Sequence, residues 1–258
     1  MNSTERKEYI LDSLDTKHSV RINELSQNLK VTRETIRRDL NTLEKEGMIK
    51  KVHGGAILDN QTGETDYEKR KIEHWHAKEK IAKLAASYIE EGDSVYLDYG
   101  TTTLALAKEI CKMKNITVVT NTVPIINTLL KNDAIDIIIP GGLLRSNESS
   151  LFGQFALNNM CEIFVNIGFF GCSGIESKAG VTSHHMGEVQ VSKQMVEQSQ
   201  SVIILADQSK FGNMAFNRTA SLEEIDIVIT DTLGDDIKDY DALNEHGIEL
   251  ISAEKRSN

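Results

Sequence analysis

The chain has 258 residues, a formal net charge of −10 at pH 7 and three cysteines. This length suits one large domain or two ordinary ones, and no apolar run approaches the roughly 20 residues needed to cross a membrane. The odd cysteine count, without a metal-binding spacing, predicts free thiols in a reducing compartment. Because the N-terminus is polar and has no signal-peptide core, we expect a cytoplasmic protein and exclude the disulfide-rich and membrane-spanning classes.

The beginning of the chain predicts three helices. Residues 4–14 form the first, residues 22–29 form a shorter second one, and residues 30–31 supply a turn. Thr32 is suited to cap the third helix, because its hydroxyl can accept a bond from a free backbone N–H of the first turn. Gly47 is expected to end that helix, as glycine commonly does.

The third helix separates an apolar face from a basic one. Ile36, Leu40 and Leu43 recur at helical spacing and predict a face turned toward a core. We expect Asp39 to orient an arginine or a neighbouring backbone group, because a carboxylate aimed at phosphate would be repelled. The arginines that lie off the apolar face are Arg33, Arg37 and, at an angle, Arg38.

A basic hairpin is predicted directly after this helix. Residues 48–53 form its first strand, Gly54-Gly55 its tight turn and residues 56–58 its returning strand. The side chains expected to face DNA phosphate are Lys50, Lys51 and His53. A charged helix face alone is more often simply solvated, but this order of parts fits a winged helix-turn-helix in a DNA major groove.

The charge distribution agrees with a DNA-binding domain at residues 1–58. This segment holds 11 Lys and Arg against 9 Asp and Glu, a net charge of +2, so the rest of the chain carries −12. A near-neutral segment with a local basic face fits specific binding better than indiscriminate coating of DNA. Residues 59–76 are polar and predict a linker that passes into a connecting helix, in which Trp75 is expected to pack between domains or subunits.

A larger α/β domain is predicted over residues 77–258. Its strands are rich in Ile and Val without clean alternation, which favours a mostly parallel sheet covered on both faces. The expected strands are residues 94–97, 116–120, 135–139, 163–168, 202–206, 227–230 and 248–251. The expected helices are residues 80–89, 102–113, 123–131, 155–160 and 188–198.

Four loops of this domain predict a ligand site, because parallel sheets bind ligands at the carboxyl ends of their strands. In residues 98–103 a glycine permits close backbone approach, and threonine hydroxyls and free helix N–H groups suit a phosphate. Asn121 offers a donor and an acceptor after the next strand. The other two loops contain Gly141-Gly142 followed by Arg145, and Lys210. Residues 170–174 and 180–182 also look loop-like. A single such turn is more often a plain helix start, but four of them at one sheet end favour a site.

The N-terminal segment resembles the DeoR family of bacterial transcriptional regulators. The residues that carry the resemblance are Arg6, Ile10, Thr32, residues 35–40, Leu43, Glu44, Gly47 and residues 52–56. In that family the segment is a winged-helix DNA reader, and the second helix of the motif is the recognition helix. The candidate DNA-binding residues are therefore Thr32, Arg33, Thr35, Arg37, Arg38, Lys50, Lys51 and His53.

The resemblance extends over most of the chain. It implies a sensor domain for phosphorylated sugars or related metabolites, related in fold to ribose-5-phosphate isomerase and the CoA transferases. It also implies that residues 100–103 and Lys210 hold the phosphate and that Asp98 and Glu188 hold sugar hydroxyls. The candidate effector-binding residues are Asp98, Gly100, Thr101, Thr102, Thr103, Asn121, Gly141, Gly142, Arg145, Gly171, Gly174, Glu188 and Lys210.

One departure from the family pattern affects effector recognition. Many relatives carry a Glu and a Lys where this chain has Gln190 and Ser192. Lys193 does not take that position, because one helical residue turns a side chain by about 100°. His184-His185, just before Glu188, are either a specificity element or ordinary exposed loop histidines.

The leading hypothesis is a repressor of a sugar or carbohydrate catabolic operon. A phosphorylated sugar bound in the C-terminal domain would modulate operator binding, and about 1–3 kcal/mol of differential affinity would suffice. The expected partners are double-stranded operator DNA and the sugar phosphate, in a homodimer or homotetramer that presents paired recognition helices. No cofactor, metal or membrane partner is expected.

Two enzymatic hypotheses remain as alternatives. A sugar-phosphate isomerase would use residue types such as Asp98, Glu188 and Lys210 for acid–base chemistry, but it has no need of an arginine-rich N-terminal helix. A sugar kinase is suggested by the Asp-x-Gly-Thr-Thr sequence that begins at Asp98, but the chain lacks a later Asp-x-Gly-x-Gly partner motif. We therefore expect a regulator without enzymatic activity.

Overall fold

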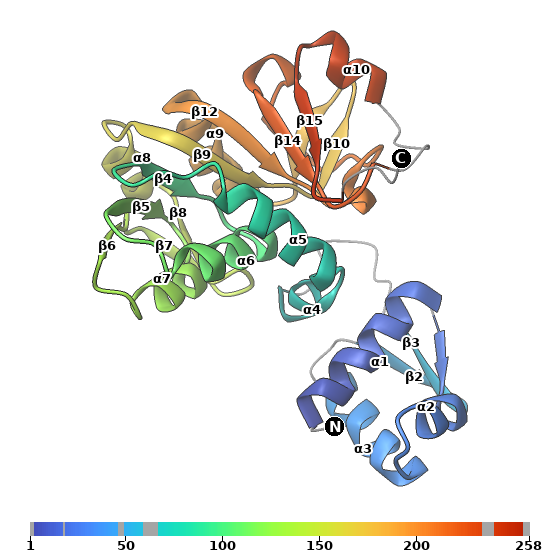
Figure 1. The fold of residues 1–258 in the computed structure, drawn as a ribbon. Coiled ribbons are helices and arrows are strands. Elements are labelled where there is room, and N and C mark those ends of the chain that lie inside the picture. The colour runs from blue at the N-terminus through green and yellow to red at the C-terminus, as the bar shows by residue number, and fades with distance from the viewer. Residues whose placement is uncertain (1–2, 18, 46–48, 59–66, 234–239, 255–258) are drawn as a thin grey trace. The chain divides into compact units, whose positions relative to one another are not determined.

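In a computed structural model the chain forms two compact units, residues 1–75 and 76–258 (Figure 1). The structure describes residues 3–17, 19–45, 49–58, 67–233 and 240–254. Gly47, which was expected to end the third helix, and residues 59–66 of the expected linker lie outside the described residues. Each unit has a hydrophobic core of its own, and each is described by itself.

The first unit is a small helical domain with a three-stranded antiparallel sheet of order β1-β3-β2. Ile36, Leu40 and Leu43 have no exposed surface, which confirms the predicted apolar face. The unit's elements are α1 (Ser3–Lys17), β1 (Ser19–Arg21), α2 (Ile22–Asn28), α3 (Arg33–Lys45), β2 (Ile49–Val52), β3 (Gly55–Leu58) and α4 (Tyr67–Ile72). Strands β2 and β3 form the predicted wing, and α3 is the predicted third helix. The turn of the wing is His53-Gly54 and not the predicted Gly54-Gly55, because Gly55 already pairs with Val52 in the sheet.

Strand β1 was not predicted, and a glycine explains why it can pair. A Cβ on Gly55 would lie 1.9 Å from the carbonyl oxygen of Val20. Only a glycine therefore lets β3 approach β1 closely enough to form their ladder. The backbone N–H of Ile22 also donates to the carbonyl of Gly54 at 2.9 Å, which joins the wing turn to the start of α2.

A partly buried ion pair connects α1 to α3. The Nε of Arg6 donates to Oδ2 of Asp39 at 2.8 Å, and its Nη2 donates to Oδ1 at 3.2 Å. Asp39 is only 4% exposed, so its charge needs such a partner to offset the loss of water. The expectation that Asp39 orients an arginine is confirmed, and the arginine comes from α1.

Trp75, the last residue of the first unit, also contacts α1. Its indole N–H donates to Oδ1 of Asp12 at 3.0 Å. Both residues belong to the first unit, so this bond does not test the expectation that Trp75 packs between domains or subunits.

The second unit contains a seven-stranded sheet of order β15-β14-β12-β9-β4-β5-β6. All of its neighbouring strands pair in parallel, which confirms the predicted α/β fold with a mostly parallel sheet. Its strands are β4 (Ser94–Leu97), β5 (Ile116–Thr120), β6 (Ile135–Ile138), β9 (Val165–Gly171), β12 (Ser199–Leu205), β14 (Ile227–Thr230) and β15 (Glu249–Ser252).

The sheet is buried on both faces by helices that alternate with its strands. Tyr96 and Phe170 belong to the core cluster on one face, while their neighbours Leu97 and Phe169 are equally buried with no exposed surface. Successive strand residues point to opposite faces, so both faces are covered (Figure 1). The helices are α5 (Trp75–Ala86), α6 (Thr101–Ile110), α7 (Val123–Leu129), α8 (Gln154–Met160), α9 (Met186–Glu197) and α10 (Tyr240–Glu245).

Two small antiparallel sheets were missed from the sequence. One is the hairpin of β7 (Leu143–Arg145) and β8 (Ser150–Phe152), and the other has order β10-β11-β13. The latter contains β10 (Gly174–Glu176), β11 (Gly180–Ser183) and β13 (Asn217–Ala220). The loop-like interpretation of residues 170–174 and 180–182 was therefore wrong in part. Very short strands rich in glycine carry almost no local propensity signal.

In strand β9, a single glycine led the sequence prediction to the wrong strand end. The prediction ended this strand at Gly168, but β9 continues to Gly171. A Cβ on Gly168 would lie 2.3 Å from the Oγ of Ser199 on the neighbouring strand. The glycine is thus needed inside the strand for close approach and does not mark its end.

Leu40→Ala should destabilise the first unit by about 2–5 kcal/mol, because it leaves a cavity in a fully buried site. Lys45→Ala, at the exposed end of the same helix, should change the stability by less than about 0.5 kcal/mol. Urea unfolding of the full chain, followed by a probe in the first unit, measures both. Equal losses in the two variants would contradict the assigned core face.

Candidate functional site

The start of α3 is held by two threonines. The backbone N–H of Thr35 donates to Oγ1 of Thr32 at 3.2 Å, and the two hydroxyls are 2.9 Å apart. The predicted helix cap is therefore confirmed. Helix α3 begins at Arg33, directly after this cap.

The outward face of α3 is basic. Arg33, Arg37 and Arg38 are exposed, while Ile36 and Leu40 face the core. Arg37 Nη1 lies 3.3 Å from Oε2 of Glu34, but both side chains are more than half exposed. Such a surface pair contributes little, so Arg37 can exchange it for another anion.

The wing places its two lysines differently. Lys50, Lys51 and His53 are all exposed. The Lys51 side chain, 39% exposed, extends along α3, with its ammonium 2.7 Å from Oδ1 of Asn41 and 3.0 Å from Oε2 of Glu44. Of the basic wing residues expected to face phosphate, Lys51 is thus the one that the structure turns toward the recognition helix.

In the second unit, polar residues gather at the carboxyl ends of the parallel strands. Asp98 directly follows β4, and Asn121 directly follows β5. Tyr96 joins them, because its hydroxyl lies 3.0 Å from Oδ1 of Asp98 and 3.4 Å from Oδ1 of Asn121. The structure therefore brings together two predicted site residues that are 23 positions apart, through a tyrosine that the prediction did not include.

The loop after β4 leads into α6 through a glycine. Gly100 has a φ of +128°, a conformation that other residues rarely adopt. The next three residues form the first turn of α6, and all three threonines are 9% exposed or less. The free N–H groups of that turn and the positive end of the helix dipole form an arrangement that favours an anion.

Asp98 is buried and has an altered acidity. It is 2% exposed, and burial raises its pKa from 3.8 to about 7, while hydrogen bonds from Ser192, the Tyr99 backbone and Tyr96 oppose that rise. The Ser192 hydroxyl donates to Oδ1 of Asp98 at 2.8 Å. Ser192 lies one turn beyond Glu188 on α9, and this four-residue spacing, which puts both on one helix face, was the available signal for its role.

Glu188 is fully buried and paired with Arg145. Arg145 Nη1 lies 2.6 Å from Oε2 of Glu188, and the Ser150 hydroxyl donates to Oε1. Arg145 and Ser150 come from the two strands of the β7–β8 hairpin. This hairpin was missed from the sequence, so the meeting of Arg145 with Glu188 was missed as well.

His185 caps α9. Its Nδ1 accepts a bond from the Glu188 backbone N–H at 3.3 Å and lies 3.6 Å from Oε2 of Glu188. The imidazole also stacks edge-on against Phe152, with ring centroids 5.0 Å apart. His184 is exposed, so the two histidines differ in environment, and His185 is the one next to the predicted site.

Several predicted site glycines have a packing role. A Cβ on Gly142 would lie 2.6 Å from the Phe152 carbonyl oxygen, and one on Gly174 would lie 2.2 Å from that of Asn213. Gly171 is less confined, with the Tyr99 carbonyl at 3.4 Å. The close approach of the neighbouring backbone is therefore enough to require glycine at Gly142 and Gly174, independent of any ligand.

Lys210 lies at the end of β12 in the short helix η1 (Gln208–Lys210). Its backbone N–H donates to the Asp207 carbonyl at 3.0 Å. Burial raises the pKa of the Cys172 thiol to about 12, and the positive charge of Lys210 partly opposes that rise. Because Lys210 follows β12, which neighbours β9 in the sheet, it lies at the same carboxyl end of the sheet as Asp98.

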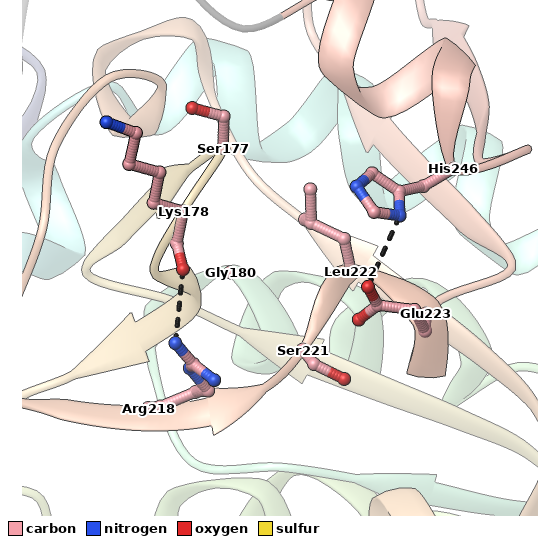
Figure 2. Close-up of a pocket in the computed structure, with 8 residues that line it drawn as sticks. All are labelled: Ser177, Lys178, Gly180, Arg218, Ser221, Leu222, Glu223 and His246. Atoms are coloured by element: carbon pink, nitrogen blue, oxygen red, sulfur yellow. Dashed lines mark hydrogen bonds and ion pairs between the residues drawn. The ribbon is translucent and has the colours of Figure 1, made fainter.

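A separate pocket of about 120 Å³ lies elsewhere in the second unit (Figure 2). Arg218 donates to the carbonyls of Ala179 and Lys178 at 2.8 and 3.1 Å, and His246 Nδ1 lies 3.4 Å from Oε1 of Glu223. Glu223 and His246 precede β14 and β15, so this pocket borders the amino ends of those strands. It contains none of the predicted site residues.

Within the described ranges, no cluster of three or more His, Cys, Asp or Glu is placed to hold a metal ion. No helix in those ranges is long and apolar enough to span a membrane.

A capped basic helix with a hairpin wing, and a parallel α/β sheet with a polar carboxyl edge, define a DNA-binding transcriptional regulator with a sensor domain. The chain belongs to the DeoR family. The family's DeoR-like helix-turn-helix domain matches residues 6–62, and its DeoR C terminal sensor domain matches residues 73–232.

Curated relatives match along nearly the whole chain. The "Glycerol-3-phosphate regulon repressor" of Escherichia coli (strain K12) is 32% identical over 97% of this chain and 99% of its own length. The "HTH-type transcriptional repressor GlcR" of Bacillus subtilis (strain 168) is 35% identical over 99% and 98%. The regulator FruR of the same strain is 36% identical over 90% and 92%.

A ribose 5-phosphate isomerase from Methanocaldococcus jannaschii superposes with a TM-score of 0.41 and 16% identity, over 53% of this chain and 54% of its own.

The stability of the second unit should depend on pH through Asp98. Because its folded pKa is raised from 3.8 to about 7, the folded state keeps a proton that the unfolded chain releases. The free energy of unfolding should therefore fall as the pH rises between these two values and then level off. Asp98→Asn should abolish this pH-dependent fall in the free energy of unfolding. Asp136→Asn, at an exposed site on β6, should leave it unchanged. Denaturant titrations across that pH range measure the slopes, and an unchanged slope in Asp98→Asn would rule out this assignment.

Proposed function

We propose that the protein is a repressor of a carbohydrate catabolic operon, and that a phosphorylated sugar in the second unit modulates its binding to operator DNA. The observation that carries this proposal is the exposed arginine face of α3 in a chain that also contains the family's sensor domain. Relatives that are named repressors, one of them of a glycerol-3-phosphate regulon, support it.

For DNA, we propose that α3 enters the major groove with its exposed side chains toward the bases. Arg33, Arg37 and Arg38 suit bidentate contacts with guanine or contacts with phosphate. Thr32 and Thr35 lie at the N-terminal end of the same helix, where recognition helices meet base edges. Lys50 and His53 of the wing are exposed and suit neighbouring phosphates.

For the effector, we propose that its phosphate binds at the N-terminus of α6. Gly100 allows close approach, and the free N–H groups of the first turn favour an anion. Lys210 supplies a positive charge at the same sheet end. Asn121 and Gly171 complete this edge, next to the strand ends of β5 and β9.

Asp98 and Glu188 suit the sugar hydroxyls in this proposal. Each carboxyl group already accepts bonds from protein side chains, but a carboxyl group, ionised or protonated, has further hydrogen-bonding positions for a hydroxyl. We also propose a sensor without enzymatic activity, because the chain joins this domain to a DeoR-like helix-turn-helix domain, which an isomerase does not need.

We further propose that the protein acts in the cytoplasm as a homodimer or homotetramer. Two copies would present recognition helices about one DNA turn apart to a symmetric or directly repeated operator. An effector that binds the two states with different affinity would then shift the geometry of the pair.

Arg38→Ala should weaken binding to DNA from the protein's own upstream region by about 1–3 kcal/mol at fixed salt. Its thermal midpoint should stay unchanged, because Arg38 is exposed. Arg6→Ala should lower both affinity and thermal midpoint, because it leaves Asp39 buried without this partner. Lys17→Ala, at the exposed end of α1, is the charge control. Fluorescence anisotropy and thermal unfolding separate these effects, and wild-type affinity in Arg38→Ala would contradict the proposed interface.

Titration with a panel of sugar phosphates should identify one that raises the thermal midpoint of the chain and lowers operator affinity by about 5- to 150-fold. Lys210→Ala should lose most of that response while keeping its operator affinity without effector. Lys193→Ala, exposed on α9, should respond like the wild type. If every panel member leaves both quantities unchanged, or if Lys210→Ala responds fully, the proposed phosphate site is wrong. Turnover of pentose or hexose phosphates would instead support the isomerase alternative.

A further inference from the structure

The wing strand β2 lies at an edge of its sheet. The order β1-β3-β2 leaves one side of β2 without a neighbouring strand, so the outward N–H groups of β2 need water or a side chain as their acceptor. The Lys51 backbone N–H donates to Oε1 of Glu44, on α3, at 3.0 Å. A side chain of the recognition helix therefore takes the place that another strand would have.

The same carboxylate also holds the Lys51 side chain. Oε2 of Glu44 lies 3.0 Å from the Lys51 ammonium, which also donates to Oδ1 of Asn41 at 2.7 Å. One carboxylate thus binds the backbone and the side chain of a single wing residue. Both bonds favour the ionised form: the pKa of Glu44 is lowered, first by the Lys51 side-chain bond and then by the Lys51 backbone bond.

The strand geometry explains why Lys51 and Lys50 differ. Successive residues of a strand point to opposite faces, so Lys51 shares a face with Ile49, which is 2% exposed in the core of the unit. That face is turned toward α3. Lys50 points to the other face, so the two lysines differ in direction, although both are exposed.

We propose that Glu44 is a positioning residue that fixes the wing against the recognition helix through Lys51, and that Lys50, rather than Lys51, provides the lysine contact of the wing with DNA phosphate. This inference rests on the DNA binding proposed above. In the three-stranded sheet, β1 pairs with β3 and not with β2, so the bonds from Glu44 are what hold the outer strand β2 against α3. These bonds therefore set the angle at which the wing meets the backbone of the duplex.

Two substitutions of Glu44 separate positioning from charge. Glu44→Ala and Glu44→Gln remove the same negative charge, but only Gln keeps an oxygen that can accept the Lys51 N–H. Glu44→Ala should bind operator about threefold to tenfold more weakly than Glu44→Gln, the effect of one lost hydrogen bond. If Glu44 acts only as a charge near DNA, both variants should bind equally and more tightly than the wild type. That result would overturn the proposal.

The salt dependence of binding tests the two lysines. Each phosphate contact contributes about 0.9 to the slope of log affinity against log salt. Lys50→Met should reduce the slope by about that amount, whereas Lys51→Met should leave the slope unchanged and lower the affinity at all salt concentrations. A Lys51→Met slope that falls as much as that of Lys50→Met would show that Lys51 contacts phosphate and would overturn the assignment.

Amide hydrogen exchange in the full chain without DNA provides an independent test. The Lys51 amide should be protected in the wild type, exposed to exchange in Glu44→Ala and intermediate in Glu44→Gln, with the Lys50 amide as an internal reference. Loss of protection in Glu44→Ala supports the tether whether or not DNA binds. A failure of every DNA fragment to bind would count against the proposed function and not against the tether. Equal protection of Lys51 in all three proteins would overturn the tether.

Discussion

Both units are organised around carboxylates that have been removed from water. A buried carboxylate is tolerated only where cationic or polar groups surround it. In the first unit Asp39 meets this requirement with Arg6, and the pair fixes the recognition helix to the first helix. In the second unit Glu188 requires Arg145 and Ser150, and this requirement draws the β7–β8 hairpin to α9.

The hairpin is also joined to the sheet through its backbone. The N–H of Leu151 donates to the Asn121 carbonyl at 2.7 Å, and the N–H of Val123 donates to the Ser149 carbonyl at 2.9 Å. The loop after β5 is therefore bonded to the hairpin that carries Arg145. A ligand that contacts Asn121 would act on the same bonded group of residues as one that contacts Glu188, although these residues lie on different elements.

The parts that the sequence predicted well are those whose signal is local. The cap at Thr32, the apolar spacing of Ile36 and Leu40, and the Ile/Val-rich strands each lie within one element, and periodicity is enough to find them. The meeting of Arg145 with Glu188 spans 43 positions and depends on a hairpin whose strands have three residues each. No periodic pattern marks such a strand. The role of each glycine was also not evident from the sequence. Gly54 forms a turn, whereas Gly55 and Gly168 allow neighbouring strands to approach closely.

Helix α3 divides its residues between fixed and variable positions, and this division affects how the protein can evolve. Its inward face is committed to the core and to Arg6, and Glu44 is occupied with the wing. The exposed arginines do not pack in the core, so the fold depends less on them. New operator preferences can therefore arise by replacing them one at a time, without loss of stability, whereas a change at Asp39 needs a simultaneous change in α1. Related regulators can diverge in the DNA they select while keeping one scaffold.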